Sequence, residues 1–330
     1  YTTTAGLPAL RKKIAESWHH LSPNLDENNV CMTMSGTNAL LNIFASLVDP
    51  GKNVLLPEPY FPLYGPDVKL WGGEARYYQC LFENEFVPTI EHLESLVDDN
   101  TVAILYNFPS NPTGATISIE QRDELLKFAQ KHDLWIISDE VYDRIVFDSE
   151  HVSFVGSDDD RVILINSFSK TYAMTGWRIG YILSANNEAM HQMIKLQYYI
   201  TACSNDAMQY AVLEAMNVAD DYPDQMCVEY KARRDLICSR LNAMKGIQCH
   251  VPEGRFLCVP QGRCSEYEQS RSCNRVAKRW RIMFPGKCLW AFRRRSSQVC
   301  LHHFTRRYIS WNGQGRDCNQ EVTWRLICGT

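Results

Sequence analysis

Three short apolar runs without polar alternation mark the middle of the chain, at residues 101–106, 134–138 and 162–165. Such runs are typical of parallel strands that are covered on both faces. Helical spacing of apolar residues between the first two runs predicts a helix over 118–132. Strand, helix and strand in this order predict a doubly wound α/β fold, in which ligands bind at the carboxyl edge of the sheet.

The same periodicity predicts further elements on both sides of this centre. Residues 53–57 are expected to form a strand, and helices are expected at 6–18, 185–197, 206–219 and 224–245. The last helix places Tyr230, Leu236, Ile237 and Leu241 on its inner side. It is expected to bridge from a large domain, residues 1–235, to the start of a smaller domain, residues 236–254.

Polar residues follow the ends of the predicted strands, where a doubly wound sheet gathers its ligand contacts. They are Asn111, Asp139, Tyr142 and Lys170. A carboxylate in the place of Asp139 is either a helix cap or the anionic partner of a protonated ring nitrogen. A lysine at the end of a buried strand needs a partner or a reason to lose its charge, and a Schiff base is such a reason.

Donors suited to a phosphate stand on both sides of Lys170. A small-residue turn at a helix start directs free backbone N–H groups outward, and arginine can grip two phosphate oxygens at once. The candidate donors are Ser35, Gly36, Thr37, Ser167, Ser169 and Arg178. Phe61 or Tyr64 could stack on a flat heterocycle. Together these residues predict a phosphorylated aldehyde bound to Lys170, which is pyridoxal phosphate.

Charge divides the chain into two unlike regions. Of the 34 Lys+Arg and 38 Asp+Glu, residues 1–254 hold 19 and 34, and residues 255–330 hold 15 and 4. Eight of the 13 cysteines lie from Cys249 onward, without a Cys-x-x-Cys pair, so no metal site is expected. No apolar run approaches a membrane span, and the scattered cysteines of the first region suit a reducing compartment. We expect a cytoplasmic protein.

Four motifs occur together in order: Ser35-Gly-Thr, Asn111-Pro-Thr-Gly, Ser138-Asp-Glu-Val-Tyr and Ser167-Phe-Ser-Lys with Arg178. In this combination residues 1–254 resemble the class I and II aminotransferases, which are fold type I pyridoxal phosphate enzymes. The resemblance implies a fold type I large domain and an incomplete small domain. It also implies transfer of an amino group between an L-amino acid and a 2-oxo acid.

The resemblance implies a role for each candidate residue. Lys170 would form the Schiff base and move the proton between substrate and cofactor, and Asp139 would keep the ring nitrogen protonated. Tyr142 and Asn111 would bond the ring's 3-oxygen, and Phe61 would stack on the ring. The phosphate would be held by Ser35, Gly36, Thr37, Ser167, Ser169 and Arg178, with Ser35 standing where several relatives carry glycine.

Tyr1 matches a tyrosine that crosses the dimer interface to the neighbour's phosphate, so the resemblance implies a homodimer with shared sites. The family's N-terminal arm has no counterpart here, and we expect the chain to be truncated at this end. The partners expected are a small amino acid and a 2-oxo acid, and no membrane.

Residues 255–330 depart from the family pattern, because the arginine segment that clamps the substrate carboxylate is missing. We interpret this basic, Cys- and Trp-rich tail as poorly ordered and translated one nucleotide out of frame. Synonymous codons for Gln298-Val-Cys-Leu, shifted by one base, encode Arg-Tyr-Val-Ser, which resembles that clamp. A basic extension that binds nucleic acid is the rival interpretation, but no recognisable motif accompanies the charge.

Two other functions share the predicted site. A pyridoxal phosphate C–S lyase of the same fold would use every residue named above. A non-catalytic remnant of an aminotransferase would keep the cofactor residues without turnover. Loss of the cofactor's absorbance on adding an amino acid, and its return with a 2-oxo acid, separates the transaminase from both.

Overall fold

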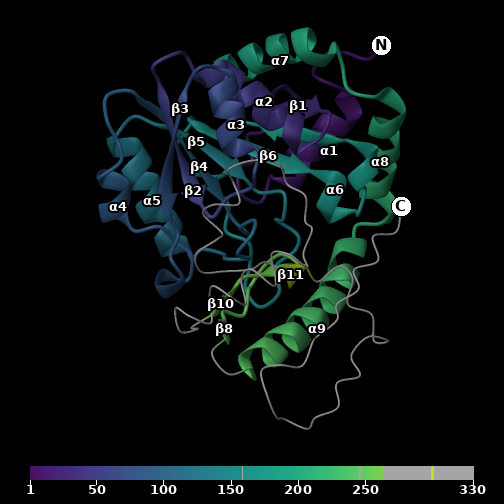
Figure 1. Cartoon of the computed structure of the whole chain (residues 1–330). Helices are drawn as coiled ribbons and strands as arrows, with labels where there is room; N and C mark the ends of the chain where they lie inside the picture. Colours follow the sequence, from purple (N-terminus) through teal and green to yellow (C-terminus); the bar gives the residue numbers. More distant parts are fainter. Residues whose placement is uncertain (158, 245–246, 263–298, 301–330) are drawn as a thin grey trace.

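A computed structural model describes residues 1–157, 159–244, 247–262 and 299–300. Its centre is a sheet of seven strands in the order β1-β7-β6-β5-β4-β2-β3 (Figure 1). Strands β2 to β6 are parallel to one another, whereas β7 pairs antiparallel with both β6 and β1. The strands are β1 (Val30–Thr33), β2 (Asn53–Glu58), β3 (Glu74–Gln79), β4 (Thr101–Asn107), β5 (Trp135–Asp139), β6 (Val162–Ser167) and β7 (Gly180–Leu183).

Helices cover both faces of this sheet, as the continuous apolar strands require. They are α1 (Pro8–Ser17), α2 (Gly36–Leu47), α3 (Tyr64–Leu70), α4 (Ile90–Glu94), α5 (Ile119–Lys131), α6 (Phe168–Thr171), α7 (Asn187–Thr201), α8 (Asp206–Val218) and α9 (Tyr222–Asn242). Short 3-10 turns occupy Glu27–Asn29, Phe82–Asn84 and Thr175–Trp177. The predicted fold class is confirmed: a mixed α/β protein with a mostly parallel sheet.

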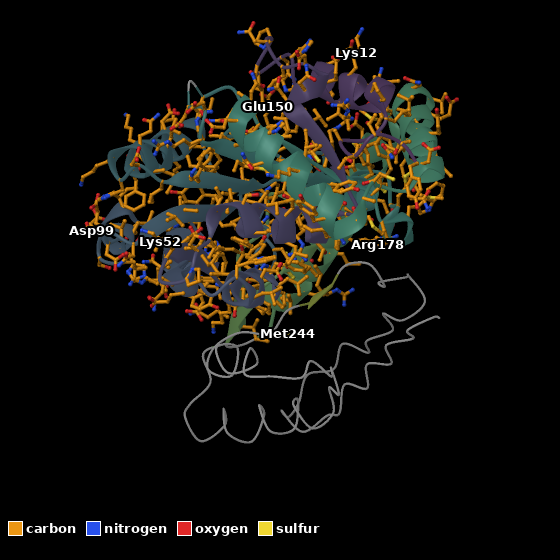
Figure 2. The ribbon with its side chains drawn as sticks, turned by 90° about the horizontal axis from the view of Figure 1, so that it is seen from above. Lys12, Lys52, Asp99, Glu150, Arg178 and Met244 are labelled. Atoms are coloured by element: carbon orange, nitrogen blue, oxygen red, sulfur yellow. The ribbon has the colours of Figure 1, made fainter. Side chains whose placement is uncertain are left out.

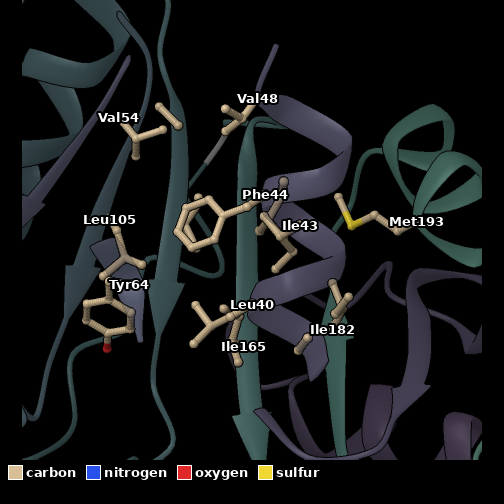
Figure 3. Packing of buried hydrophobic residues seen from close by; sticks show 14 of the residues in the cluster. Leu40, Ile43, Phe44, Val48, Val54, Tyr64, Leu105, Ile165, Ile182 and Met193 are labelled. Carbon is tan, nitrogen blue, oxygen red and sulfur yellow. The ribbon is translucent and has the colours of Figure 1, made fainter. Parts of the chain in front are cut away.

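Successive residues along a strand point to opposite faces of the sheet and therefore pack in different apolar clusters. On one face, Leu40 and Phe44 of α2 pack with Leu105, Ile165 and other strand residues, and α7 adds Met193 (Figure 3). On the other face, α5 packs on β4 and β5, and α1 and α8 pack on β1, β6 and β7. Both faces are therefore closed to solvent, and the carboxyl ends of the strands remain as the place for a ligand.

A fourth apolar cluster joins α9 to two short strands, β8 (Ile247–Cys249) and β9 (Leu257–Cys258). β10 (Pro260–Gly262) pairs with β8, and β11 (Val299–Cys300) pairs with β9. Tyr230, Ile237 and Leu241 of α9 are buried there, as predicted. Leu236 is 39% exposed, so its predicted inward position is wrong. It neighbours Ile237 and so points about 100° away from it around the helix.

Charged side chains such as Lys12, Lys52 and Asp99 lie on the outside of the molecule (Figure 2). Among the described residues, no helix is both long enough and apolar enough to cross a lipid bilayer. The predicted out-of-frame segment lies mostly outside the described residues. Of that segment, residues 255–262 and 299–300 are described, and Arg255, Phe256, Leu257, Cys258 and Val259 are buried.

Candidate active site

Asp139 is the last residue of β5, and its side chain is buried at the carboxyl edge of the sheet. The hydroxyl of Tyr64 donates a hydrogen bond of 2.6 Å to its carboxylate, and Asn107 Nδ2 donates one of 2.8 Å to its backbone oxygen. Burial raises the pKa of Asp139 to about 6, against the opposing effect of the Tyr64 hydrogen bond. The site therefore holds an anion in an environment that disfavours charge.

Tyr64 was one of two aromatic residues that could stack on a ligand. It lies at the start of α3 and is fully buried, with its hydroxyl committed to Asp139. Phe61 is only partly buried and meets the Tyr64 ring edge-on, with 5.6 Å between the ring centroids. Of the two aromatic candidates, Phe61 is the one whose ring is left for a ligand.

Lys170 lies in α6, directly after β6. Its Nζ is 6.0 Å from the centroid of the Tyr142 ring and 5.7 Å from that of Phe256. Tyr142 is buried and follows Asp139 by three residues. The structure thus brings Asp139, Tyr142 and Lys170 to one edge. Asn111 joins them through its backbone N–H, which donates to Asn107 Oδ1 at 2.7 Å.

The phosphate-type donors form a cradle, which we define as Ser35, Gly36, Ser167, Ser169 and Arg178. The guanidinium of Arg178 donates to Ser35 Oγ, and Ser167 Oγ accepts from the N–H of Ser169 at 3.2 Å. Ser169 Oγ is buried and has no hydrogen-bond partner. Gly36 is the first residue of α2, so the positive end of that helix faces the cradle.

Gly180 allows the two sides of the cradle to meet. It pairs with Thr33 on β1 and with Ser167 on β6. A methyl group at Gly180 would lie 2.9 Å from the backbone nitrogen of Gly36 and 2.8 Å from the backbone oxygen of Asn166. A larger residue at this position would therefore separate the start of α2 from the end of β6.

A cavity of about 260 Å³ opens beside the cradle. It is lined by Met34, Ser35, Thr37, Asn38, Leu41, Asp67 and Arg178. Thr37 and Arg178 are exposed, and Figure 2 shows Arg178 at the margin of the molecule. Tyr1 is fully exposed at the N-terminus. The cradle therefore borders open space on its α2 side.

Arg255 lies at the site although no sequence pattern predicted it there. Its guanidinium carbon lies 4.7 Å from the centroid of the Tyr142 ring, and only 5% of the residue is exposed. The positive charge of Arg255 lowers the pKa of Asp139, although burial has the larger, opposite effect. The indication that the sequence offered for Arg255 was its position directly after the Pro-Glu-Gly turn, where the resemblance to the family ends. Nothing in local spacing links it to residues over 100 positions earlier.

A mostly parallel sheet thus carries a buried carboxylate, a lysine and a cluster of anion-type donors at its carboxyl edge, which is where such folds bind ligands. The sequence model of the aminotransferase class I and II family matches residues 1–286. The chain belongs to this family. It is accordingly an aminotransferase, a transferase of a class that depends on pyridoxal phosphate.

The relatives carry aminotransferase names. The chain is 36% identical over 259 residues to an aspartate aminotransferase of Thermotoga maritima. This match covers 78% of this chain and 67% of the relative. The crystal structure of a Thermotoga maritima aspartate aminotransferase has a TM-score of 0.77 at 33% identity, covering 84% of this chain and 73% of that one. The crystal structure of an aromatic aminotransferase from Pyrococcus horikoshii has a TM-score of 0.82 at 30% identity. The match covers 91% of this chain and 82% of that one.

Removing the charge of Asp139 should change how stability depends on pH. Because the folded pKa of about 6 lies above the ordinary 3.8, the folded state binds this proton more tightly than the unfolded state. The contribution to stability is present at low pH and is lost as the pH rises through 6. Asp139→Asn should therefore stabilise the cofactor-free protein at pH 7, relative to pH 4, by about 2 kcal/mol.

Urea unfolding of both proteins at the two pH values measures this difference, and Glu124→Gln, which changes an exposed carboxylate of α5, serves as the control. A stability difference between Asp139→Asn and the parent that does not vary with pH would contradict the account.

Ser35 adopts a backbone conformation that favours glycine, with φ 79° and ψ 167°. Such a conformation costs a residue with a Cβ about 1–3 kcal/mol. Ser35→Gly and Ser35→Ala both remove the hydroxyl that Arg178 contacts, but only the glycine relieves the strain. The glycine variant should be more stable than the alanine variant by about 1 kcal/mol, after the greater chain entropy of unfolded glycine is included. Thermal or urea unfolding measures the stability difference between the two variants. An alanine variant as stable as the glycine variant, or more stable, would show that the backbone at residue 35 is not strained.

Proposed function

We propose that this chain binds pyridoxal phosphate at the edge formed by Asp139, Tyr142 and Lys170, and transfers an amino group between an amino acid and a 2-oxo acid. The observation that carries the proposal is the convergence of these three side chains next to an anion cradle. The family and the names of the relatives support the reaction class.

The residues present fit the cofactor at both of its charged ends. Ser169 Oγ, buried without a partner, is a donor or acceptor that a phosphate oxygen would satisfy. Gly180 lets the N–H groups at the start of α2 approach Ser167 closely. At the other end, the buried carboxylate of Asp139 suits a protonated ring nitrogen.

Each side chain then has a proposed task. The cradle and Thr37 hold the phosphate, and Phe61 lies against the ring. Tyr142 and Asn111 form hydrogen bonds with the ring oxygen, and Lys170 holds the cofactor through its amine. When bound, the cofactor's ring serves as an electron sink for the substrate's α-carbon. Once the substrate amine has replaced it on the cofactor, the Lys170 amine would accept the proton from that carbon, and Asp139 would keep its charge opposite the ring nitrogen.

Aspartate, alanine and aromatic amino acids appear in the names of the relatives, and we propose an L-amino acid with its 2-oxo acid as the substrate class. We also propose a homodimer. Tyr198 and Tyr199 of α7 and Tyr210 of α8 are exposed by 56–70%, along the margin where Figure 1 shows the N-terminus. Sedimentation of the full chain should give the mass of two copies, and a monomer would exclude a site shared with Tyr1.

Lys170→Ala tests the cofactor site directly. The parent chain should develop the absorbance of lysine-bound cofactor when pyridoxal phosphate is added, because Lys170 is the amine at the site. The variant should not, whereas the exposed-lysine control Lys131→Ala should behave as the parent does. Equal absorbance in the Lys170 variant and the parent would place the cofactor elsewhere.

The same absorbance follows the reaction. An amino acid should abolish it and a 2-oxo acid should restore it, as a two-step amino transfer requires. Release of ammonia without restoration by the 2-oxo acid would indicate a lyase. Stable absorbance that no amino acid alters would indicate a chain that binds the cofactor without turnover.

Arg255 places a second cation beside the carboxylate that would face the ring nitrogen. Because like charges repel, its removal should tighten the binding of pyridoxal phosphate. Arg255→Gln should lower the dissociation constant about tenfold, equivalent to about 1.4 kcal/mol. Arg255→Lys, which keeps the charge, should bind the cofactor as the parent does. A glutamine variant with unchanged or weaker cofactor binding would show that the guanidinium does not compete with the ring.

A further inference from the structure

Three buried cysteines from three different elements bring their sulfur atoms together in the cluster that contains Tyr142 and Phe256. Cys238 lies on α9, Cys249 ends β8 and Cys258 ends β9. Their exposures are 2%, 5% and 0%, and the three Sγ atoms lie within 4.8 Å of one another. We call these residues the thiol cluster.

The chain holds two of these ligands in place before any ion arrives. Asn242, at the end of α9, accepts from the N–H of Cys249 at 2.8 Å and donates to its carbonyl at 3.1 Å. This pair of bonds fixes β8 against the helix that carries Cys238. Cys258 approaches on β9, whose Leu257 and Cys258 pair with β11. Rigid placement of the ligands is what a metal site requires.

A buried cysteine often serves only as a small apolar side chain. Cys31 and Cys80 are buried in this way, and neither belongs to a three-ligand group among the described residues. The thiol cluster differs because its sulfurs also interact with each other. The three sulfurs are close enough to share one ion, and the thiolate is the form in which they would bind it.

We propose that Cys238, Cys249 and Cys258 form a binding site for a thiophilic d¹⁰ cation, Zn²⁺ by charge. Three sulfurs at about 2.3 Å from one ion lie about 4.0 Å apart in a trigonal arrangement. The observed separations reach this spacing with movements below about 1 Å. Cys spacing along the sequence gives no sign of the site, because its ligands come from a helix and two separate strands.

Net charge distinguishes the candidate ions. Three thiolates leave a charge of about −1 with Zn²⁺ and about −2 with Cu⁺, and a larger buried charge is less favourable in an apolar cluster. Arg234 is 3% exposed and lies one helical turn before Cys238. The carbonyl of His250, to which Cys249 Sγ donates at 3.3 Å, is available to a fourth coordination position.

Metal at the thiol cluster would tie the end of the described chain to α9. Cys258 is two residues after Phe256, whose ring faces Lys170, and three after Arg255. The ion would therefore have a structural role, holding one wall of the candidate active site. This inference concerns the wall alone and does not depend on the bound cofactor.

Residue-resolved labelling of the full chain tests the proposal. The protein is reduced, stripped of metal and pulsed with an alkylating reagent in mild denaturant, with and without Zn²⁺, and peptides are mapped by mass spectrometry. Zn²⁺ should slow labelling of Cys238, Cys249 and Cys258 together by roughly tenfold or more, and labelling of Cys31 and Cys80 by less than about twofold. Mapping by residue separates these thiols from the cysteines beyond residue 262.

Equal effects of Zn²⁺ on all buried cysteines, or no effect on the three, would overturn the proposal. A second measurement uses Cd²⁺, whose bonds to thiolates absorb in the ultraviolet. Cys258→Ala should lose about one bound Cd²⁺ per chain, and the matched buried control Cys80→Ala should lose none. Because Cys258→Ala could weaken folding, its circular dichroism is compared with that of the control. A folded Cys258→Ala chain that keeps its full Cd²⁺ complement would also refute the site.

Discussion

The buried carboxylate of Asp139 is the constraint on which the candidate site depends. An ionised carboxyl group away from water is unfavourable unless hydrogen bonds and positive charges surround it. Here Tyr64 and Asn107, from the ends of other segments at the same sheet edge, supply the hydrogen bonds. Arg255 lies against the Tyr142 ring and supplies positive charge that lowers the pKa of Asp139. Segments far apart in the sequence thus meet around one residue at the end of β5.

The fold itself could be predicted from the sequence to a large extent. Continuous apolar runs identified β4, β5 and β6, because a parallel strand buried on both faces has no polar alternation. Their ends also located Asp139 and Lys170. The antiparallel placement of β7 was not predicted, since four residues of apolar sequence do not encode strand direction. Gly180 at its start is where the two halves of the cradle meet.

Long-range contacts were the part that local patterns could not provide. Tyr64 was one of two candidates to stack on a ligand, but its hydroxyl donates a hydrogen bond to Asp139, which is 75 positions later. Arg255 lay past the last family-like residue and so carried no motif, although it packs on Tyr142. The positive φ of Ser35 is a backbone property that a serine in the sequence conceals. Each of these features arises only when the sheet brings distant segments together.

The thiol cluster and the candidate active site are parts of one packing unit. Phe256 contacts the rings of both Tyr142 and Tyr230, and its neighbours Leu257 and Cys258 reach into the cluster beside α9. An interaction that holds β9 in place therefore also holds the Phe256 ring, which lies near Lys170. Stability of this short segment and geometry of the site are therefore coupled through direct contact.

The central claim is that Lys170 is the residue that holds the cofactor. The most direct measurement is borohydride reduction of the full chain after incubation with pyridoxal phosphate, followed by peptide mass mapping of every lysine. The account requires the stable cofactor adduct on the peptide that contains Lys170, at a stoichiometry well above that of any other lysine. An adduct spread evenly over surface lysines, with Lys170 unmodified, would contradict it.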